Sequence, residues 1–189
     1  MTRVAVTGGI GSGKTFVCRL LQRHGISVYD SDAAARRLMR DDASLRLCLQ
    51  ALVGDEVYIN KVLQKAVLAQ YLLASEAHKQ AVNDIVHPAV AADFMQSGYQ
   101  WLESAILFDS GFYKRVPFDY YVCVTAPLEL RVQRVMQRDG ITRAKTMEWI
   151  GRQMPQEEVA RRCHYVIEND GQKDLDKQII QLLNNITNH

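Results

Sequence analysis

The chain has 189 residues, 48% of them hydrophobic, which is enough to fill the core of one domain or of one domain with a modest insertion. Its 23 basic and 21 acidic residues leave a formal charge of only +2, which argues against a dedicated nucleic-acid binder. The four cysteines never fall within four residues of one another, so they indicate neither a zinc knuckle nor a redox pair.

The first forty residues alternate between strand and helix patterns. A short apolar segment at 3–7 predicts a strand that ends in glycines, and the apolar spacing over 15–23 predicts a helix. Residues 26–29 predict a second buried strand. Asp30-Ser31-Asp32 follows that strand, at the point where a helix over 33–40 needs a capping side chain.

The rest of the chain contains an insertion and further strands. Between about residues 41 and 98 the helical spacing repeats, so we interpret this segment as a mainly helical insertion. Residues 101–108 and 120–125 predict two more strands, the second followed by Pro127 in the first turn of a helix. A further helical stretch, a short strand at 165–168 and an amphipathic helix follow. Strands that alternate with helices predict an α/β fold with a parallel sheet.

One motif indicates the chemistry. Gly8-Gly9-Ile10-Gly11-Ser12-Gly13-Lys14-Thr15 matches G-x-x-x-x-G-K-[ST] and lies between a predicted strand and a predicted helix. Its glycines let backbone N–H groups point at phosphate oxygens, and the helix adds the positive end of its dipole. Lys14 would reach the β- and γ-phosphates, and the Thr15 hydroxyl would ligate magnesium. A dinucleotide fingerprint is excluded because Lys14 occupies its third glycine position.

Phosphoryl transfer to an alcohol also needs a carboxylate that orients the hydroxyl and accepts its proton. Asp32 follows the second predicted strand, whose end shares a crevice with the glycine loop in a doubly wound sheet, so we assign this role to Asp32. Two alternatives stay open: Asp32 is only a helix cap, or Asp30 is the base.

Arginines that stabilise the transferring phosphoryl group are expected on a mobile segment. Arg138 and Arg143, on either side of Gly140, are the candidates, with Arg134 as a third. The alternative is that these arginines form a solvated basic helix face.

With these residues assembled, the chain resembles the dephospho-coenzyme A kinase family almost from end to end. The similar motifs are the opening Val-Thr-Gly-Gly-Ile-Gly-Ser-Gly-Lys-Thr, Asp30-Ser31-Asp32 with Ala35-Arg36, His87-Pro88, Arg134 and Arg138 before Thr142-Arg143, and Val166-Ile167-Glu168-Asn169-Asp170-Gly171.

The resemblance implies a three-layer P-loop kinase fold with a parallel five-stranded sheet, a helical acceptor-binding insertion and a small lid. The implied nucleotide-binding core comprises residues 1–40, 99–137 and 160–189. The acceptor subdomain would then span 41–98 and the lid 138–159.

The resemblance also implies a reaction: transfer of phosphate from ATP, with Mg2+, to the 3′-hydroxyl of the ribose of dephospho-coenzyme A, the last step of coenzyme A biosynthesis. Asp32 would be the base, with Lys14 and Arg138 as the other catalytic residues. The implied nucleotide ligands are Gly8, Gly9, Gly11, Ser12, Gly13, Lys14, Thr15, Arg143 and Asn169, the last beside adenine. The implied acceptor ligands are Asp32, Arg36, Lys65 and His87.

Some positions depart from the family pattern. The family carries an acidic residue and then Pro-Leu-Leu-Phe-Glu, whereas this chain has Glu103 followed by a segment with Ala105 in place of the proline and Asp109 in place of the final Glu. These changes weaken the case for Glu103 as an indirect magnesium partner. Lys65 replaces an arginine and offers a point charge instead of a planar fork, and Arg131 stands where glutamine is common.

Rival interpretations remain at this point. The chain could be another small-molecule P-loop kinase, such as a nucleoside monophosphate kinase. A nucleotide-dependent switch would need an Asn-Lys-x-Asp motif, which the sequence lacks, and Lys14, Thr15 and Asp32 argue against a degenerate loop that only binds. Without the family resemblance, His87 before Pro88 would be an ordinary residue at a helix start.

The expected partner is a small-molecule substrate, with no nucleic acid and no membrane, and we expect a monomer or a small homo-oligomer. The sequence shows no leader segment and no apolar run of about 18 residues, so we expect a cytoplasmic protein.

Overall fold

The structure is a computed structural model that describes residues 2–187. Contacts within the chain divide it into two compact units. The first comprises Met1–Tyr29, Tyr99–Tyr113 and Pro117–His189, and the second comprises Asp30–Gly98 and Lys114–Val116.

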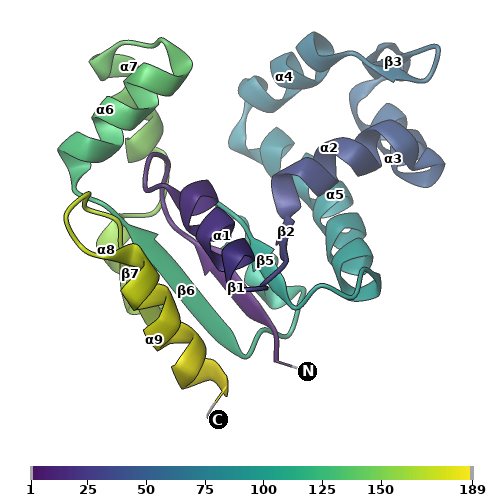
Figure 1. The fold of residues 1–189 in the computed structure, drawn as a ribbon. Coiled ribbons are helices and arrows are strands. Elements are labelled where there is room, and N and C mark those ends of the chain that lie inside the picture. The colour runs from purple at the N-terminus through teal and green to yellow at the C-terminus, as the bar shows by residue number, and fades with distance from the viewer. Residues whose placement is uncertain (1, 188–189) are drawn as a thin grey trace. The chain divides into compact units, whose positions relative to one another are not determined.

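A five-stranded parallel sheet is the centre of the first unit (Figure 1), and its strand order is β2-β5-β1-β6-β7. In the central strand, Ala5 is in register with Leu102 on one side and Tyr121 on the other. Every residue of that strand is buried, as expected for a strand covered on both faces. The strands are β1 (Val4–Thr7), β2 (Val28–Asp30), β5 (Trp101–Glu103), β6 (Tyr120–Thr125) and β7 (Tyr165–Glu168).

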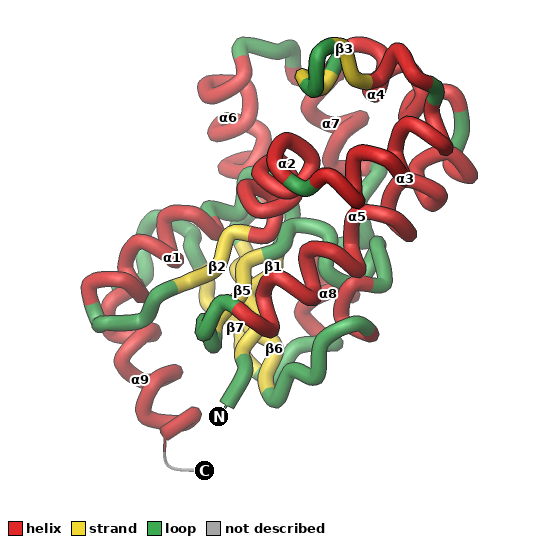
Figure 2. Tube along the Cα trace, turned by 90° about the vertical axis from the view of Figure 1, so that its right-hand side faces the viewer, coloured by secondary structure: helices red, strands yellow, loops and turns green. Residues whose placement is uncertain are grey.

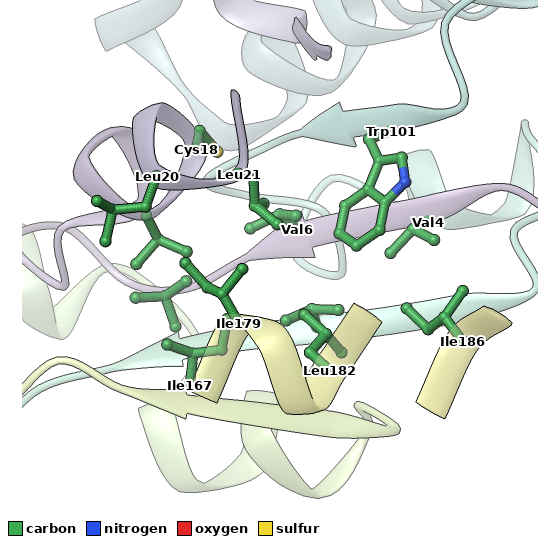
Figure 3. Packing of buried hydrophobic residues seen from close by; sticks show 13 residues of the cluster. Val4, Val6, Cys18, Leu20, Leu21, Trp101, Ile167, Ile179, Leu182 and Ile186 are labelled. Carbon is green, nitrogen blue, oxygen red and sulfur yellow. The ribbon is translucent and has the colours of Figure 1, made fainter. Parts of the chain in front are cut away.

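Helices cover both faces of this sheet, which gives three layers. Figure 2 shows α1 (Lys14–Arg23) and α9 (Leu175–Thr187) on one side of the strands and α8 (Gln156–Arg161) on the other. The apolar residues of α9 recur every three or four positions, so one stripe of the helix faces the core. In Figure 3, Ile179 and Leu182 from this stripe pack with Leu21 of α1 around the buried β1 side chains.

Two further helices follow β6 in the first unit, α6 (Leu128–Asp139) and α7 (Arg143–Gly151). The helix predicted after Pro127 is confirmed, although Pro127 is its N-cap residue and not part of its first turn. Gly140 ends α6 with a φ of +66°, which glycine adopts without strain. A short 3-10 turn at Phe112–Lys114 precedes β6.

The strand predicted over 101–108 is wrong beyond Glu103. The backbone N–H of Ser104 still donates to the carbonyl oxygen of Val6 at 3.0 Å, but the chain then turns. Leu107 and Phe108 are buried within this turn. A short apolar run predicts burial, but it does not distinguish a strand from a buried turn.

The second unit is mainly helical, as predicted for this part of the chain. It also contains a small hairpin that the sequence analysis missed, formed by β3 (Tyr58–Ile59) and β4 (Val62–Leu63) after a 3-10 turn at Asp55–Val57. Asn60 and Lys61 join the two strands with φ values of +50° and +65°, which is typical of a two-residue hairpin turn. The helices are α2 (Ser31–Asp41), α3 (Ala43–Val53), α4 (Lys65–Ala74) and α5 (Glu76–Gln96). Over the described residues, no helix is both long and apolar enough to span a membrane.

Candidate active site

The glycine loop joins β1 to α1 at the carboxyl end of the central strand (Figure 1). Gly8, Gly11 and Gly13 have φ values of +146°, +79° and +89°, where other residues are strained. A Cβ atom on Gly8 would lie 2.3 Å from the carbonyl oxygen of Val124, and one on Gly11 would lie 2.6 Å from that of Arg131. The loop backbone therefore packs directly on its neighbours, with no room for side chains at these positions.

The start of α1 has the features of an anion site. Its N-cap residue is Gly13, which provides no side-chain hydrogen bond, and its first turn contains no acidic residue. The first N–H groups of the helix and the positive end of its dipole therefore suit a phosphate group. Lys14 is only 8% exposed beside them, whereas Thr15 is exposed.

Arg134 and Asn169 support the loop through its carbonyl oxygens. The Asn169 side chain is buried and donates from Nδ2 to the carbonyl oxygen of Ser12 at 2.8 Å. Arg134 donates to the carbonyl oxygens of Gly11 and Ser12 at 3.4 Å and to Asn169 Oδ1 at 3.2 Å. Both residues therefore help to fix the shape of the loop, and the adenine contact of Asn169 stays a prediction.

A second pair of side chains, neither of which was predicted to belong to the site, holds the peptide groups of Ile10. Arg131 Nε donates to the Ile10 carbonyl oxygen at 2.9 Å, and the Ile10 N–H donates to Gln153 Oε1 at 2.7 Å. Arg131 precedes Arg134 by three residues on α6, a spacing that places both on one helix face and could have identified Arg131. No motif or spacing in the sequence marks Gln153.

The predicted lid arginines have carboxylate partners. Arg138 pairs with the adjacent Asp139 and Arg143 pairs with Glu129, each at 2.7 Å and each exposed to solvent. The hydrogen bond from Arg143 lowers the pKa of the Glu129 carboxyl. Among the described residues, neither arginine donates a hydrogen bond to the glycine loop.

Two acidic residues lie in the segment 103–109, whose sequence departs from the family pattern. Glu103 ends β5 in register with Val6 of β1, so it lies at the same edge of the sheet as the glycine loop. Asp109 Oδ1 accepts a hydrogen bond from the backbone N–H of Met154 at 2.8 Å, directly after Gln153 in the chain. Asp109 therefore anchors the segment that holds the Ile10 peptide.

Asp30 and Asp32 have different environments in the second unit. Asp30 caps α2, because its carboxylate accepts a hydrogen bond from the N–H of Ala33, and the alternative in which Asp32 is the cap is wrong. Asp32 lies exposed in the first turn, and Arg36 follows four residues later on the same face of α2. Lys65 is the first residue of α4 and is also exposed.

His87 lies inside α5, so its interpretation as a helix-start residue is wrong. Pro88 follows it within the same helix of 21 residues. Burial lowers the pKa of the His87 imidazole, Arg115 acts in the same direction, and Asp84 raises this pKa. Arg115 and Asp84 form an ion pair at 3.1 Å. The half-buried imidazole therefore favours its neutral form, which both donates and accepts hydrogen bonds.

Comparison with known proteins decides the family. The model of the dephospho-CoA kinase family matches residues 2–174. A dephospho-CoA kinase of Bacteroides fragilis is 43% identical over 188 residues, which cover 96% of this chain and 91% of the relative. The chain belongs to the dephospho-CoA kinase family.

Solved structures share the fold. A crystal structure of a Thermus thermophilus protein is similar with a TM-score of 0.81 at 31% identity, covering 96% of this chain and 95% of that chain. A dephospho-CoA kinase from Campylobacter jejuni shares the fold, with a TM-score of 0.66 at 18% identity over 97% of this chain and 96% of that chain. Membership of the dephospho-CoA kinase family makes the chain a kinase and excludes the nucleotide-dependent switch.

Proposed function

We propose that the chain transfers the γ-phosphoryl group of ATP to the 3′-hydroxyl of the ribose of dephospho-coenzyme A, giving coenzyme A and ADP. The glycine loop carries this proposal. Its three positive-φ glycines, the uncapped start of α1 and the buried Lys14 form a phosphate site in a chain of the dephospho-CoA kinase family.

The donor site needs charge neutralisation on the β- and γ-phosphates. Lys14 supplies one positive charge, and the N–H groups of the loop and of α1 supply fixed dipoles that need no reorganisation during the reaction. Electrostatic stabilisation of this kind is the main catalytic contribution in phosphoryl transfer. Arg138 and Arg143 of the proposed lid would add charge when they leave their carboxylate partners.

Magnesium would be held by the exposed Thr15 hydroxyl together with oxygens of the nucleotide. Among residues 2–187, no cluster of three or more His, Cys, Asp or Glu side chains could hold a metal ion. This donor set fits a magnesium ion that arrives with its nucleotide, and it does not fit one held by an all-protein cage. A bound magnesium ion would neutralise phosphate charge.

For the acceptor, Asp32 is the proposed base. Its carboxylate is exposed and has no capping task, so it can accept the proton of a hydroxyl group. Arg36 and Lys65 carry positive charges that suit the diphosphate of the acceptor, and the neutral His87 offers a hydrogen bond.

The remaining assignments belong to the same proposal. They are the core at 1–40, 99–137 and 160–189, the acceptor subdomain at 41–98 and the lid at 138–159. The proposal also includes a contact of Asn169 with adenine, a cytoplasmic location and a monomeric or small homo-oligomeric state.

An assay of ADP release with dephospho-coenzyme A, AMP, CMP and shikimate as acceptors tests the substrate. We expect turnover only with dephospho-coenzyme A, and NMR of the product locates the new phosphate on the 3′-oxygen. Lys14→Ala, purified in parallel, controls for contaminating kinases. Faster turnover of AMP, CMP or shikimate, or a phosphate on another oxygen, would contradict the proposal and favour the rival small-molecule kinase.

A further inference from the structure

Arg131 is a cation buried beneath the glycine loop. Its side chain is 5% exposed, and its Nε donates to the Ile10 carbonyl oxygen at 2.9 Å. A Cβ atom on Gly9 would lie only 2.4 Å from Arg131 Nη2, so the guanidinium lies against the loop backbone at two successive residues. The backbone of Arg131 packs equally closely on Gly11.

Arg131 has no ion-pair partner among the described residues. Burial lowers the pKa of its guanidinium, whereas the charges of Glu157 and Cys123 raise it. An arginine stays protonated even in such surroundings, so its charge remains in the protein interior. A buried cation without an ion pair costs free energy, and an anion bound in the loop would offset that cost.

Lys14 places a second cation near the same point. The pKa of the Cys123 thiol on β6 is lowered first by its hydrogen bond with Cys163, and then by the charges of Lys14 and Arg131. Both cations therefore act electrostatically on one buried side chain of the sheet. Neutral hydrogen-bonding groups would suffice to hold the Ile10 peptide groups, so a charge at position 131 needs a further explanation.

We propose that Arg131 is a positioning residue for the nucleotide phosphates. With Gln153 it fixes the Ile10 peptide groups, and it adds a permanent positive charge behind the loop that Glu157 offsets only in part and that a bound triphosphate would offset further. Arg131 acts through the loop backbone and not as a direct ligand. The inference rests on the proposed function, because it requires ATP in the loop.

A buried charge that is offset mainly by a bound ligand has opposite effects on the free and bound protein. Arg131→Gln and Arg131→Met remove the charge, Arg131→Lys retains it, and Arg19→Gln removes an exposed charge from α1 as a matched control. Three quantities are compared for each variant. They are the thermal midpoint without nucleotide, the calorimetric affinities for ATP, ADP, AMP and adenosine, and the steady-state kcat and KM.

We expect Arg131→Gln to leave the thermal midpoint without nucleotide unchanged or higher. ATP affinity should fall roughly tenfold, since a charge-assisted interaction is lost. ADP should be affected less and adenosine not at all, with KM for ATP changing more than kcat. Arg131→Met should behave similarly, Arg131→Lys should recover most of the affinity, and Arg19→Gln should match the wild type.

Two results would overturn the inference while leaving the proposed function intact. The first is unchanged ATP affinity in Arg131→Gln. The second is a lower thermal midpoint together with equal losses for ATP and adenosine, which would show a purely structural role. A wild-type protein that does not bind ATP would instead refute the proposed function, and with it this inference.

Discussion

The carboxylate of Asp30 accepts a hydrogen bond from the backbone N–H of Ala33 at 2.8 Å, so Asp30 is the residue that caps α2. Asp32, two residues later, is exposed and makes no side-chain hydrogen bond within residues 2–187. Asp30 therefore has a structural role, and Asp32 is left for the proposed chemical role. Substitutions at the two positions should have different consequences.

Asp32→Asn should leave the thermal midpoint and ATP affinity unchanged but lower kcat at least about a hundredfold, because a general base contributes on that scale. Asp30→Ala is the matched control and should lower the free energy of unfolding by about 0.5–2 kcal/mol through loss of the cap. Steady-state kinetics and thermal denaturation of both variants distinguish these effects. If Asp32→Asn fails chiefly in ATP binding or in folding, Asp32 is not the base.

Lys14→Ala should lower kcat at least about a hundredfold, because it removes a fixed charge from the transferring phosphoryl group. Lys177→Ala, an exposed lysine of α9, serves as the control and should retain full activity. The measurement is ADP release at saturating substrate. Near-normal turnover in Lys14→Ala would remove the assigned role.

A comparison of Gly13→Ala with Gly25→Ala distinguishes the effect of a strained φ, which both variants have, from that of a steric conflict, which only one has. Their φ values are similar, +89° and +81°, so backbone strain should cost each variant about 1–2 kcal/mol of stability. Only at Gly13 would the new Cβ meet another group, at 2.1 Å from Asn169 Nδ2, whereas Gly25 has open space. We expect Gly13→Ala alone to lose ATP affinity, as measured by calorimetry. Equal behaviour of the two variants would show that the contact between Asn169 and the loop is unimportant for binding.

Glu129→Gln removes the carboxylate partner of Arg143. The ion pair is exposed, so the thermal midpoint should hardly change. If Arg143 leaves Glu129 to bind phosphate, its release should lower KM for ATP, as steady-state kinetics would show. Glu158→Gln, which breaks the exposed ion pair between Glu158 of α8 and Arg162 directly after that helix, is the control. A KM that stays the same in both variants would contradict the proposed movement of Arg143.

His87 should make the stability of the protein depend on pH. Its pKa is lowered on folding, mainly by burial, so below the unfolded value of about 6.5 the unfolded state binds a proton that the folded state does not. The His87 contribution is therefore complete above that pH and is lost as the pH falls toward the folded pKa. Asp84 and Arg115 are the charged neighbours that modulate it. As the pH is lowered, the thermal midpoint should fall less steeply in His87→Gln than in the wild type. Parallel curves of thermal midpoint against pH for the two proteins would contradict this prediction.

The elements around the glycine loop could be predicted because several local signals agree. The apolar strand, the glycines and the helical spacing after Lys14 all predict a strand, a loop and a helix in that order, which the structure confirms. The hairpin at Tyr58–Leu63 was missed because its strands have only two residues each, and Ile59 and Val62 are exposed. In such short strands the turn residues carry the only signal.

The site was harder to predict than the fold, because its supports come from distant parts of the chain. The hydrogen bonds from Asn169 to Ser12 and from Ile10 to Gln153 span 157 and 143 residues. No periodicity or spacing encodes such contacts. Arg131 was noted in the sequence only as a departure from glutamine, and its burial beneath the loop appears only in three dimensions.

The central position of β1 has a consequence for synthesis on the ribosome. Val4 pairs with Trp101 on one side and Tyr120 on the other, so the first strand to leave the ribosome waits for partners made much later. A nascent chain that ends after Thr15 but before Trp101 has the whole glycine motif but neither of the strands that flank β1. Premature termination between these two residues therefore yields a product with the motif and no folded phosphate site.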